Sequence, residues 1–190
     1  IGRGTIPFAA LCDGAGKADR SAKKALGLFQ HMFTKASLDQ QKWPRLFQDD
    51  TWAGWIQLLD AHLLDCPEST FIGVAAIGHF IVGAYVGDSR AYLVDGEGGC
   101  RLITGAESKF LLGSGLAVAT PIHETLKPRD VLLLLSDGAW TPLSLYLIQR
   151  AVVSSMMKDF SDVPRAVLDA AGRTGCADDL TAIALRIVEK

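Results

Sequence analysis

Three aspartates in this 190-residue sequence stand where apolar stretches end or begin. Asp13 follows the run FAALC, Asp137 follows VLLLLS, and Asp178 stands shortly before LTAIALRIV. Apolar runs of this kind are typical of buried strands, so we expect the three carboxylates at strand ends, where they could converge. Carboxylates that converge in a partly buried cleft stay ionised only when a cation pairs with them.

A hard divalent cation fits such a group, because Mg²⁺ and Mn²⁺ prefer carboxylate, carbonyl and water oxygens as ligands. Gly14 supports this hypothesis, since a residue without a side chain lets its backbone carbonyl approach a metal closely. The alternative is purely structural. Asp-Gly is a common turn dipeptide, and Asp88, which stands between two strand-like runs, has the same status. Spacing alone leaves a metal site and a set of ordinary turns as comparable alternatives.

Composition limits the classes of function. Apolar residues make up 49% of the chain and charged residues 21%, which is ordinary for one compact domain with its own core. The net charge of −2 gives no overall field that attracts nucleic acid or an acidic membrane. No signal peptide is visible, and the most apolar stretch, 71–86, is shorter than the about 20 residues of a membrane span. The cysteines lack zinc spacing and predict reduced thiols in a cytoplasmic protein: Cys12, Cys66, Cys100 and Cys176.

The elements that must position the aspartates follow from the periodicity of the apolar residues. The run 5–12 predicts a strand that leads into a glycine-rich turn. Apolar residues at helical spacing predict helices over 22–35, with Ser21 as the cap, and over 52–64. The polar segment 36–50 contains a proline and predicts a loop.

From residue 70 onward, short runs rich in β-branched and aromatic residues predict strands. They cover 71–77, 80–86, 90–95, 100–104, 116–125, 130–135 and 180–188. The early connections are too short for parallel crossovers, so these strands must be antiparallel. Helices are predicted over 143–158 and 163–171. Together the elements predict one α+β domain over 1–190, a four-layer α-β-β-α sandwich of two antiparallel sheets flanked by helices.

Four short segments carry a more specific signal. They read ALCDGAG at 10–16, AYVGDSRAY at 84–92, DVLLLLSDG at 130–138 and ADDLT at 177–181. In this order they resemble the motifs of the type 2C metal-dependent protein serine/threonine phosphatases, the PPM family. The stretch DGAGKADRS looks closest to a compact bacterial branch. One such motif is weak support for the resemblance, whereas four in order are strong support.

The resemblance implies a sandwich of two antiparallel sheets with two Mn²⁺ or Mg²⁺ ions at one end. By motif position, Asp13 would bridge both ions and Gly14 would provide its carbonyl oxygen to one of them. Asp137 and Asp178 would complete the other ion's ligands, which makes Asp13, Asp137 and Asp178 the expected catalytic residues. Asp88 matches the position that, with the aspartate of the SDG motif, holds a third, weaker ion in some members.

The activity implied by the resemblance is hydrolysis of phosphoserine or phosphothreonine in a protein by a water molecule that two metals activate. A phosphorylated protein, either a kinase or its target, is the implied partner, and neither nucleic acid nor a membrane is expected. Arg90 and Tyr92 are assigned structural roles. The alternatives are a pseudophosphatase that serves as a binding or regulatory module, and another two-metal hydrolase on an unrelated fold.

The sequence departs from the family pattern in several places. No arginine-bearing strand or NxD motif precedes Asp13, so the first strand of the family is expected to be missing or truncated. Ala15 occupies the position where many eukaryotic members place a histidine. Lys17 and Arg20 could meet a phosphate, although solvated loop charges are the simpler interpretation. Residues 108–114 are the candidate for a short flap over the substrate.

Overall fold

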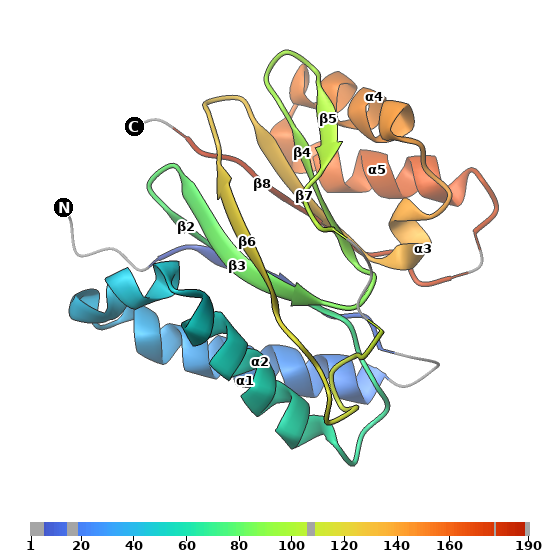
Figure 1. Cartoon of the computed structure of the whole chain (residues 1–190). Coiled ribbons are helices and arrows are strands. Elements are labelled where there is room, and N and C mark those ends of the chain that lie inside the picture. Colours follow the sequence, from blue (N-terminus) through green and yellow to red (C-terminus); the bar gives the residue numbers. More distant parts are fainter. Residues whose placement is uncertain (1–5, 15–18, 106–108, 177, 189–190) are drawn as a thin grey trace. The chain divides into compact units, whose positions relative to one another are not determined.

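The computed structural model describes residues 6–14, 19–105, 109–176 and 178–188 (Figure 1). The chain separates into two compact units. The first comprises residues 1–88 and 106–124, and the second comprises residues 89–105 and 125–190. Each unit has its own four-stranded sheet and its own helices, so each is described by itself.

The sheet of the first unit has the strand order β1-β2-β3-β6. Its strands are β1 (Phe8–Leu11), β2 (Phe71–Ile77), β3 (Phe80–Val86) and β6 (Thr120–Thr125). β1 pairs antiparallel with β2, and β2 pairs antiparallel with β3 across the turn at Gly78, whose φ of 63° suits a residue without a side chain. The helices α1 (Asp19–Ser37) and α2 (Asp49–Leu63) pack along this sheet (Figure 1).

Aromatic side chains fill the core between these helices and the first sheet. Phe29 and Phe33, four residues apart on α1, lie on one face of the helix and are buried. The ring of Phe29 meets that of Phe71 edge-on at 5.0 Å, and Trp52 of α2 lies 6.0 Å from Phe29. Burying an aromatic side chain stabilises the fold by about 2 kcal/mol or more. Trp52 of α2 therefore belongs to this core.

The sheet of the second unit has the strand order β5-β4-β7-β8, and every neighbouring pair is antiparallel. Its strands are β4 (Arg90–Val94), β5 (Cys100–Leu102), β7 (Val131–Leu135) and β8 (Ala182–Leu185). Three helices follow β7 along the chain: α3 (Asp137–Trp140), α4 (Leu145–Met156) and α5 (Val163–Gly172). Buried apolar residues of α4 and α5, such as Ile148 and Val167, pack against the strands through Leu133 and Leu135. The predicted α+β class, two antiparallel sheets flanked by helices, is confirmed.

Local details differ from the sequence-based expectations. Ser21 does not cap its helix, because α1 begins at Asp19; the Ser21 hydroxyl is buried and has no hydrogen-bond partner among the described residues. Segment 36–50 is not a plain loop but contains a 3₁₀ helix over Gln40–Phe47. The Asp39 carboxylate caps this helix by accepting the Gln41 N–H at 3.1 Å, an interaction that helical periodicity does not reveal. In the part of the chain that is described, no helix is long and apolar enough to cross a membrane.

Candidate metal centre

Asp13 and Asp88 follow strands that finish at the same end of the first sheet. Asp13 comes two residues after the end of β1, and Asp88 two residues after the end of β3. Because β2 is antiparallel to both neighbours, the ends of β1 and β3 lie on either side of the start of β2. Thr70, directly before β2, therefore stands between the two acidic segments.

The backbone of Asp13 is fixed by the residues that precede β2. Its N–H donates to Thr70 Oγ1 at 3.0 Å. Its carbonyl accepts the Thr70 N–H at 2.8 Å and the Ser69 hydroxyl at 3.0 Å. Ser69 and Thr70 are buried, so water does not compete for these bonds. Both backbone groups of Asp13 are therefore held by the segment that precedes β2.

Two glycines shape this end of the first sheet. Gly14 forms an isolated antiparallel bridge with Ser69, and its backbone carbonyl is the predicted ligand atom. Gly87 has a φ of 96°, and a Cβ there would lie 2.8 Å from Leu111 and 2.9 Å from Thr70. Only glycine satisfies both constraints. It brings the end of β3, and with it Asp88, close to Thr70.

Asp137 and Asp178 are carried by neighbouring segments of the second unit. Asp137 follows β7 and opens α3, and Asp178 precedes β8, which is the antiparallel partner of β7. Ser136 joins the two segments through its backbone and its side chain. Its N–H donates to the Thr181 carbonyl at 3.1 Å, and its hydroxyl accepts the Thr181 N–H at 3.0 Å and donates to the Asp179 carbonyl at 3.3 Å.

Gly138 allows the same two segments to touch. A Cβ at Gly138 would lie 2.5 Å from the Asp179 carbonyl oxygen and 3.1 Å from Cβ of Asp178. Any larger residue would push these segments apart. The glycine after Asp137, which sequence reasoning treats as a turn residue, is therefore needed to bring Asp178 near.

Each carboxylate of this pair uses one oxygen locally. Asp137 Oδ1 accepts the Gly138 N–H at 2.7 Å, and Asp178 Oδ1 accepts the Asp179 N–H at 2.9 Å. Over the described ranges, the second oxygen of each carboxylate has no hydrogen bond. Asp137 is half-buried and Asp178 is exposed. Two oriented carboxylates with open oxygens on touching segments suit a hard divalent cation, so these residues fit the predicted ligand set.

A cationic side chain also contacts the helix that Asp137 opens. The guanidinium carbon of Arg90 lies 3.3 Å from the ring centroid of Trp140, the last residue of α3. A cation over an indole face is attracted by about 0.5–2 kcal/mol. Burial raises the pKa of Tyr92, and the nearby Arg90 opposes this shift. These contacts agree with the structural roles predicted for Arg90 and Tyr92.

The thiol beside Asp13 is not a nucleophile at neutral pH. Burial strongly raises the pKa of Cys12, and the negative charge of Asp13 raises it further. Cys12 therefore stays protonated under ordinary conditions.

The structure brings the predicted ligands together in two groups, one in each unit. Among the described residues, no three Asp, Glu, His or Cys side chains gather into a group that could hold a metal ion. A single centre built from Asp13, Asp88, Asp137 and Asp178 thus stays a prediction. Arg20 is exposed on α1, and the predicted positions Ala15, Lys17 and Ser108 lie outside the described residues.

Sequence reasoning missed the residues that hold the acidic segments in place. Ser69 and Thr70 fix Asp13, Ser136 joins Asp137 to the Asp178 segment, and Asp60 of α2 holds the end of the predicted flap. For the first three the sequence does hold a signal, since each is a hydroxyl residue within two positions of a buried strand. Asp60 gave a different signal, an acid within the apolar face of a helix.

Comparison with known proteins identifies the fold. No protein-family model and no curated protein matches the sequence, but many solved structures do. The serine/threonine phosphatase Stp1 from Staphylococcus aureus matches with a TM-score of 0.82 and 19% identity over 97% of this chain and 85% of that one. PppA, described as a key regulatory component of T6SS in Pseudomonas aeruginosa, matches with a TM-score of 0.79 and 17% identity over 94% of this chain and 85% of that one. The catalytic domain of the phosphatase PstP in complex with two manganese ions matches with a TM-score of 0.78 and 16% identity over 97% and 92%. At these identities the likeness shows the fold alone.

Proposed function

We propose that this chain, which has the fold of bacterial serine/threonine phosphatases, is a Mn²⁺- or Mg²⁺-dependent phosphatase that acts on phosphoserine and phosphothreonine in proteins. One observation carries the proposal. Asp137 and Asp178 stand on segments that Ser136 and Gly138 hold in contact, and each presents an open carboxylate oxygen. The manganese-bound structure of PstP, which has the same fold, supports the choice of metal.

The proposed ligands come from all four motifs. Asp13, Asp137 and Asp178 would bind the ions through their carboxylates, and Gly14 would bind through its carbonyl. Asp88 is proposed for a third, weaker ion.

The chain's own residues would bind and orient the reactants. Thr70 and Ser69 fix the backbone of Asp13, and the Gly138 N–H orients the carboxylate of Asp137. When bound, the two ions would activate a water molecule for in-line attack on phosphorus and offset the charge of the phosphoryl oxygens. Carboxylates clustered without such a cation would repel one another and bind protons instead.

The proposed substrate is a phosphorylated protein, either a kinase or its target, and the proposed location is the cytoplasm. The net charge of −2 argues against a role on nucleic acid or at an acidic membrane surface. A second candidate function is that of a pseudophosphatase, a non-catalytic module that binds a partner. It is favoured by one observation, that no three metal-ligating side chains gather within the described part of the chain.

The experiment that separates the two candidates is hydrolysis of p-nitrophenyl phosphate with and without Mn²⁺. We expect turnover that requires Mn²⁺, that EDTA abolishes, and that falls at least about 100-fold in Asp137→Asn. Asp65→Asn is the matched control, because Asp65 is an exposed aspartate of the first unit and none of the proposed ligands. Turnover that is independent of Mn²⁺, or equal in both variants, would overturn the proposal. No turnover at all would leave the pseudophosphatase as the better account.

A further inference from the structure

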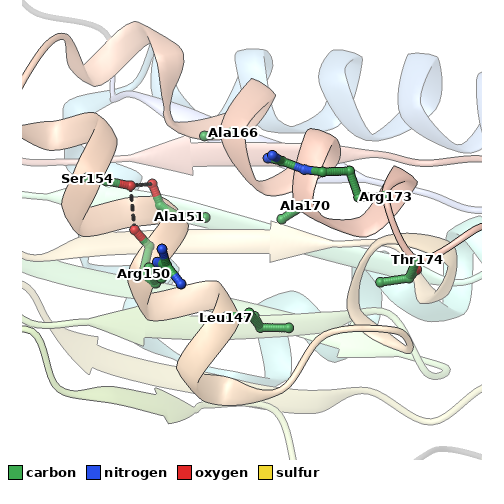
Figure 2. A pocket seen from close by; sticks show the side chains of 8 residues that line it. All are labelled: Leu147, Arg150, Ala151, Ser154, Ala166, Ala170, Arg173 and Thr174. Atoms are coloured by element: carbon green, nitrogen blue, oxygen red, sulfur yellow. Dashed lines mark hydrogen bonds between the residues drawn. The ribbon is translucent and has the colours of Figure 1, made fainter.

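A groove runs between α4 and α5 in the second unit, separate from the segments that carry Asp137 and Asp178. Its volume is about 510 Å³. Figure 2 shows that its walls come from the two helices, with Leu147, Arg150, Ala151 and Ser154 on α4 and Ala166, Ala170, Arg173 and Thr174 on and just after α5. The alanines keep the floor open, because no long side chain fills the space between the helices.

The charge of the lining is positive. Arg150 and Arg173 are its only charged residues. Within the described residues neither arginine forms an ion pair with a carboxylate. Arg173 Nε donates to the Asp169 carbonyl at 3.0 Å, which directs its side chain back along α5 towards Ala166 (Figure 2). The Asp169 carboxylate itself lies 3.9 Å from Arg165 and is not part of the lining.

The two hydroxyl groups of the lining donate their hydrogen bonds within the protein and not to a ligand. Ser154 donates to the carbonyls of Arg150 and Ala151, and Thr174 donates to the Ala171 carbonyl at 2.6 Å. The donors left for a ligand are therefore the two guanidinium groups, which match carboxylate oxygens in geometry and charge.

An apolar stripe on the outer face of α4 adjoins the groove. Tyr146, Val153 and Met157 recur with Arg150 at helical spacing, so the four side chains lie on one face. Tyr146 is 63% exposed and Met157 is 85% exposed. Tyrosine, methionine and arginine are the residue types enriched in protein interfaces, and an exposed apolar face on a helix marks an interaction surface.

We propose that the groove and this stripe form a docking site for an acidic segment of a partner protein, and that the segment carries both carboxylates and apolar side chains. The carboxylates would pair with Arg150 and Arg173, while the apolar side chains would cover Tyr146 and Met157. A second copy of this chain is a poorer occupant, because two such faces would bring like charges together. The site does not depend on hydrolysis, so it stands or falls separately from the proposed activity.

The test uses a fluorescein-labelled helical peptide of about 14 residues, long enough to span α4. Leucines spaced three and four residues apart form one face of the peptide, and glutamates form the other. A second peptide carries lysine in place of each glutamate, and a third carries serine in place of each leucine. We expect measurable anisotropy binding to the acidic, leucine-bearing peptide alone, weakened at high salt.

Variants of the full chain locate the site. We expect Arg150→Glu and Arg173→Glu each to weaken binding at least ten-fold, and Arg45→Glu, an exposed arginine of the first unit, to leave it unchanged. Ala166→Phe should also weaken binding, because it fills the groove without changing its charge, and its melting temperature shows whether it is folded. Arg150→Lys separates charge from geometry and should retain part of the affinity.

Three results would overturn the proposal. The first is no binding of the acidic peptide at concentrations up to about 1 mM, the weakest affinity expected of a specific contact. The second is equal binding of the lysine peptide, or equal affinity in the charge-reversed variants. The third is a concentration-dependent dimer of the chain that the substitution Met157→Glu dissociates. Such a dimer would identify a second copy of the chain as the occupant.

Discussion

At the scale of single residues, Ser136 decides how the two acids of the second unit are held. Its buried hydroxyl accepts the Thr181 N–H and donates to the Asp179 carbonyl, both on the segment just before β8. Without it, two part-buried hydrogen bonds would be lost, and the backbone bond from Ser136 to Thr181 would be left to hold the Asp178 segment beside Asp137. The serine of the SDG motif thus has a structural reason to stand beside the catalytic candidate.

We therefore expect Ser136→Ala to lower the free energy of unfolding by about 1 kcal/mol, because two part-buried hydrogen bonds are lost. Urea denaturation of the wild type and the variant measures this difference. Ser154→Ala is the control, because Ser154 is exposed and bonds only to carbonyls of its own helix, and it should change stability by less than about 0.5 kcal/mol. Equal losses in both variants would contradict the role given to Ser136.

Cys100 has a pH dependence that can be tested directly. Burial, followed by the negative charge of Asp95, raises the pKa of its thiol from 9.0 to about 11. At pH 8 the thiolate fraction then falls about 100-fold, so alkylation by iodoacetamide should be at least about ten-fold slower than for N-acetylcysteine. Because the unfolded thiol loses its proton first, the same shift makes the folded state less stable as the pH rises from about 9 to about 11.

Mass spectrometry of the Cys100 peptide after timed alkylation measures the rate. Asp95→Asn is the informative variant, because it removes the negative charge and keeps a side-chain oxygen. That oxygen can still accept the hydrogen bonds that Asp95 Oδ1 accepts from the N–H groups of Glu97 and Gly99. It should speed the reaction. If Cys100 reacts as fast as the free thiol, its thiol is neither buried nor affected by Asp95, which would contradict the raised pKa.

At the scale of elements, Asp60 fixes the end of the predicted flap and the loop that leads from it to β6. Its buried carboxylate accepts the N–H groups of Gly113, Gly115 and Ala117 at 2.7, 3.1 and 3.1 Å. Gly113 and Gly115 have φ values of 95° and 75°, which turn their N–H groups towards this one acceptor. Asp60 lies among the apolar residues of α2, and its carboxylate holds three backbone amides of this loop in place.

We expect Asp60→Ala to destabilise the chain by about 3 kcal/mol, since three N–H groups lose a charged acceptor. Hydrogen exchange should become faster at those three amides than elsewhere in the first unit. Asp65 is an exposed aspartate two residues after α2, so Asp65→Asn should change neither the stability nor the exchange rates. Unchanged exchange at Gly113 and Gly115 in Asp60→Ala would contradict the anchoring role.

Secondary structure was largely predictable from sequence, because period-two and helical patterns reflect burial directly. The strands 71–77 and 80–86 were predicted to the residue. The errors fell where a side chain bonds to the backbone, as at the Asp39 cap, or where a strand is only partly paired. Segment 116–125 illustrates the second case, since only Thr120–Thr125 forms β6 while Leu116 and Val118 are exposed.

At the scale of the whole molecule, the four ordered motifs predicted the fold that the solved phosphatase structures confirm. The candidate site was predictable in part. The motifs named its aspartates, but the contacts that hold them, through Thr70, Ser136 and Gly138, depend on segments far apart in sequence and emerged only from the structure. Catalysis and metal dependence are proposals that rest on this arrangement.

Isothermal titration of the chain with Mn²⁺ counts the bound ions without requiring a substrate. We expect two bound Mn²⁺ per chain, with a third at most weak, and a loss of binding in both Asp13→Asn and Asp178→Asn, one from each unit. Asp65→Asn should bind as the wild type does. Absence of Mn²⁺ binding, or binding that survives both substitutions unchanged, would contradict the proposed metal centre.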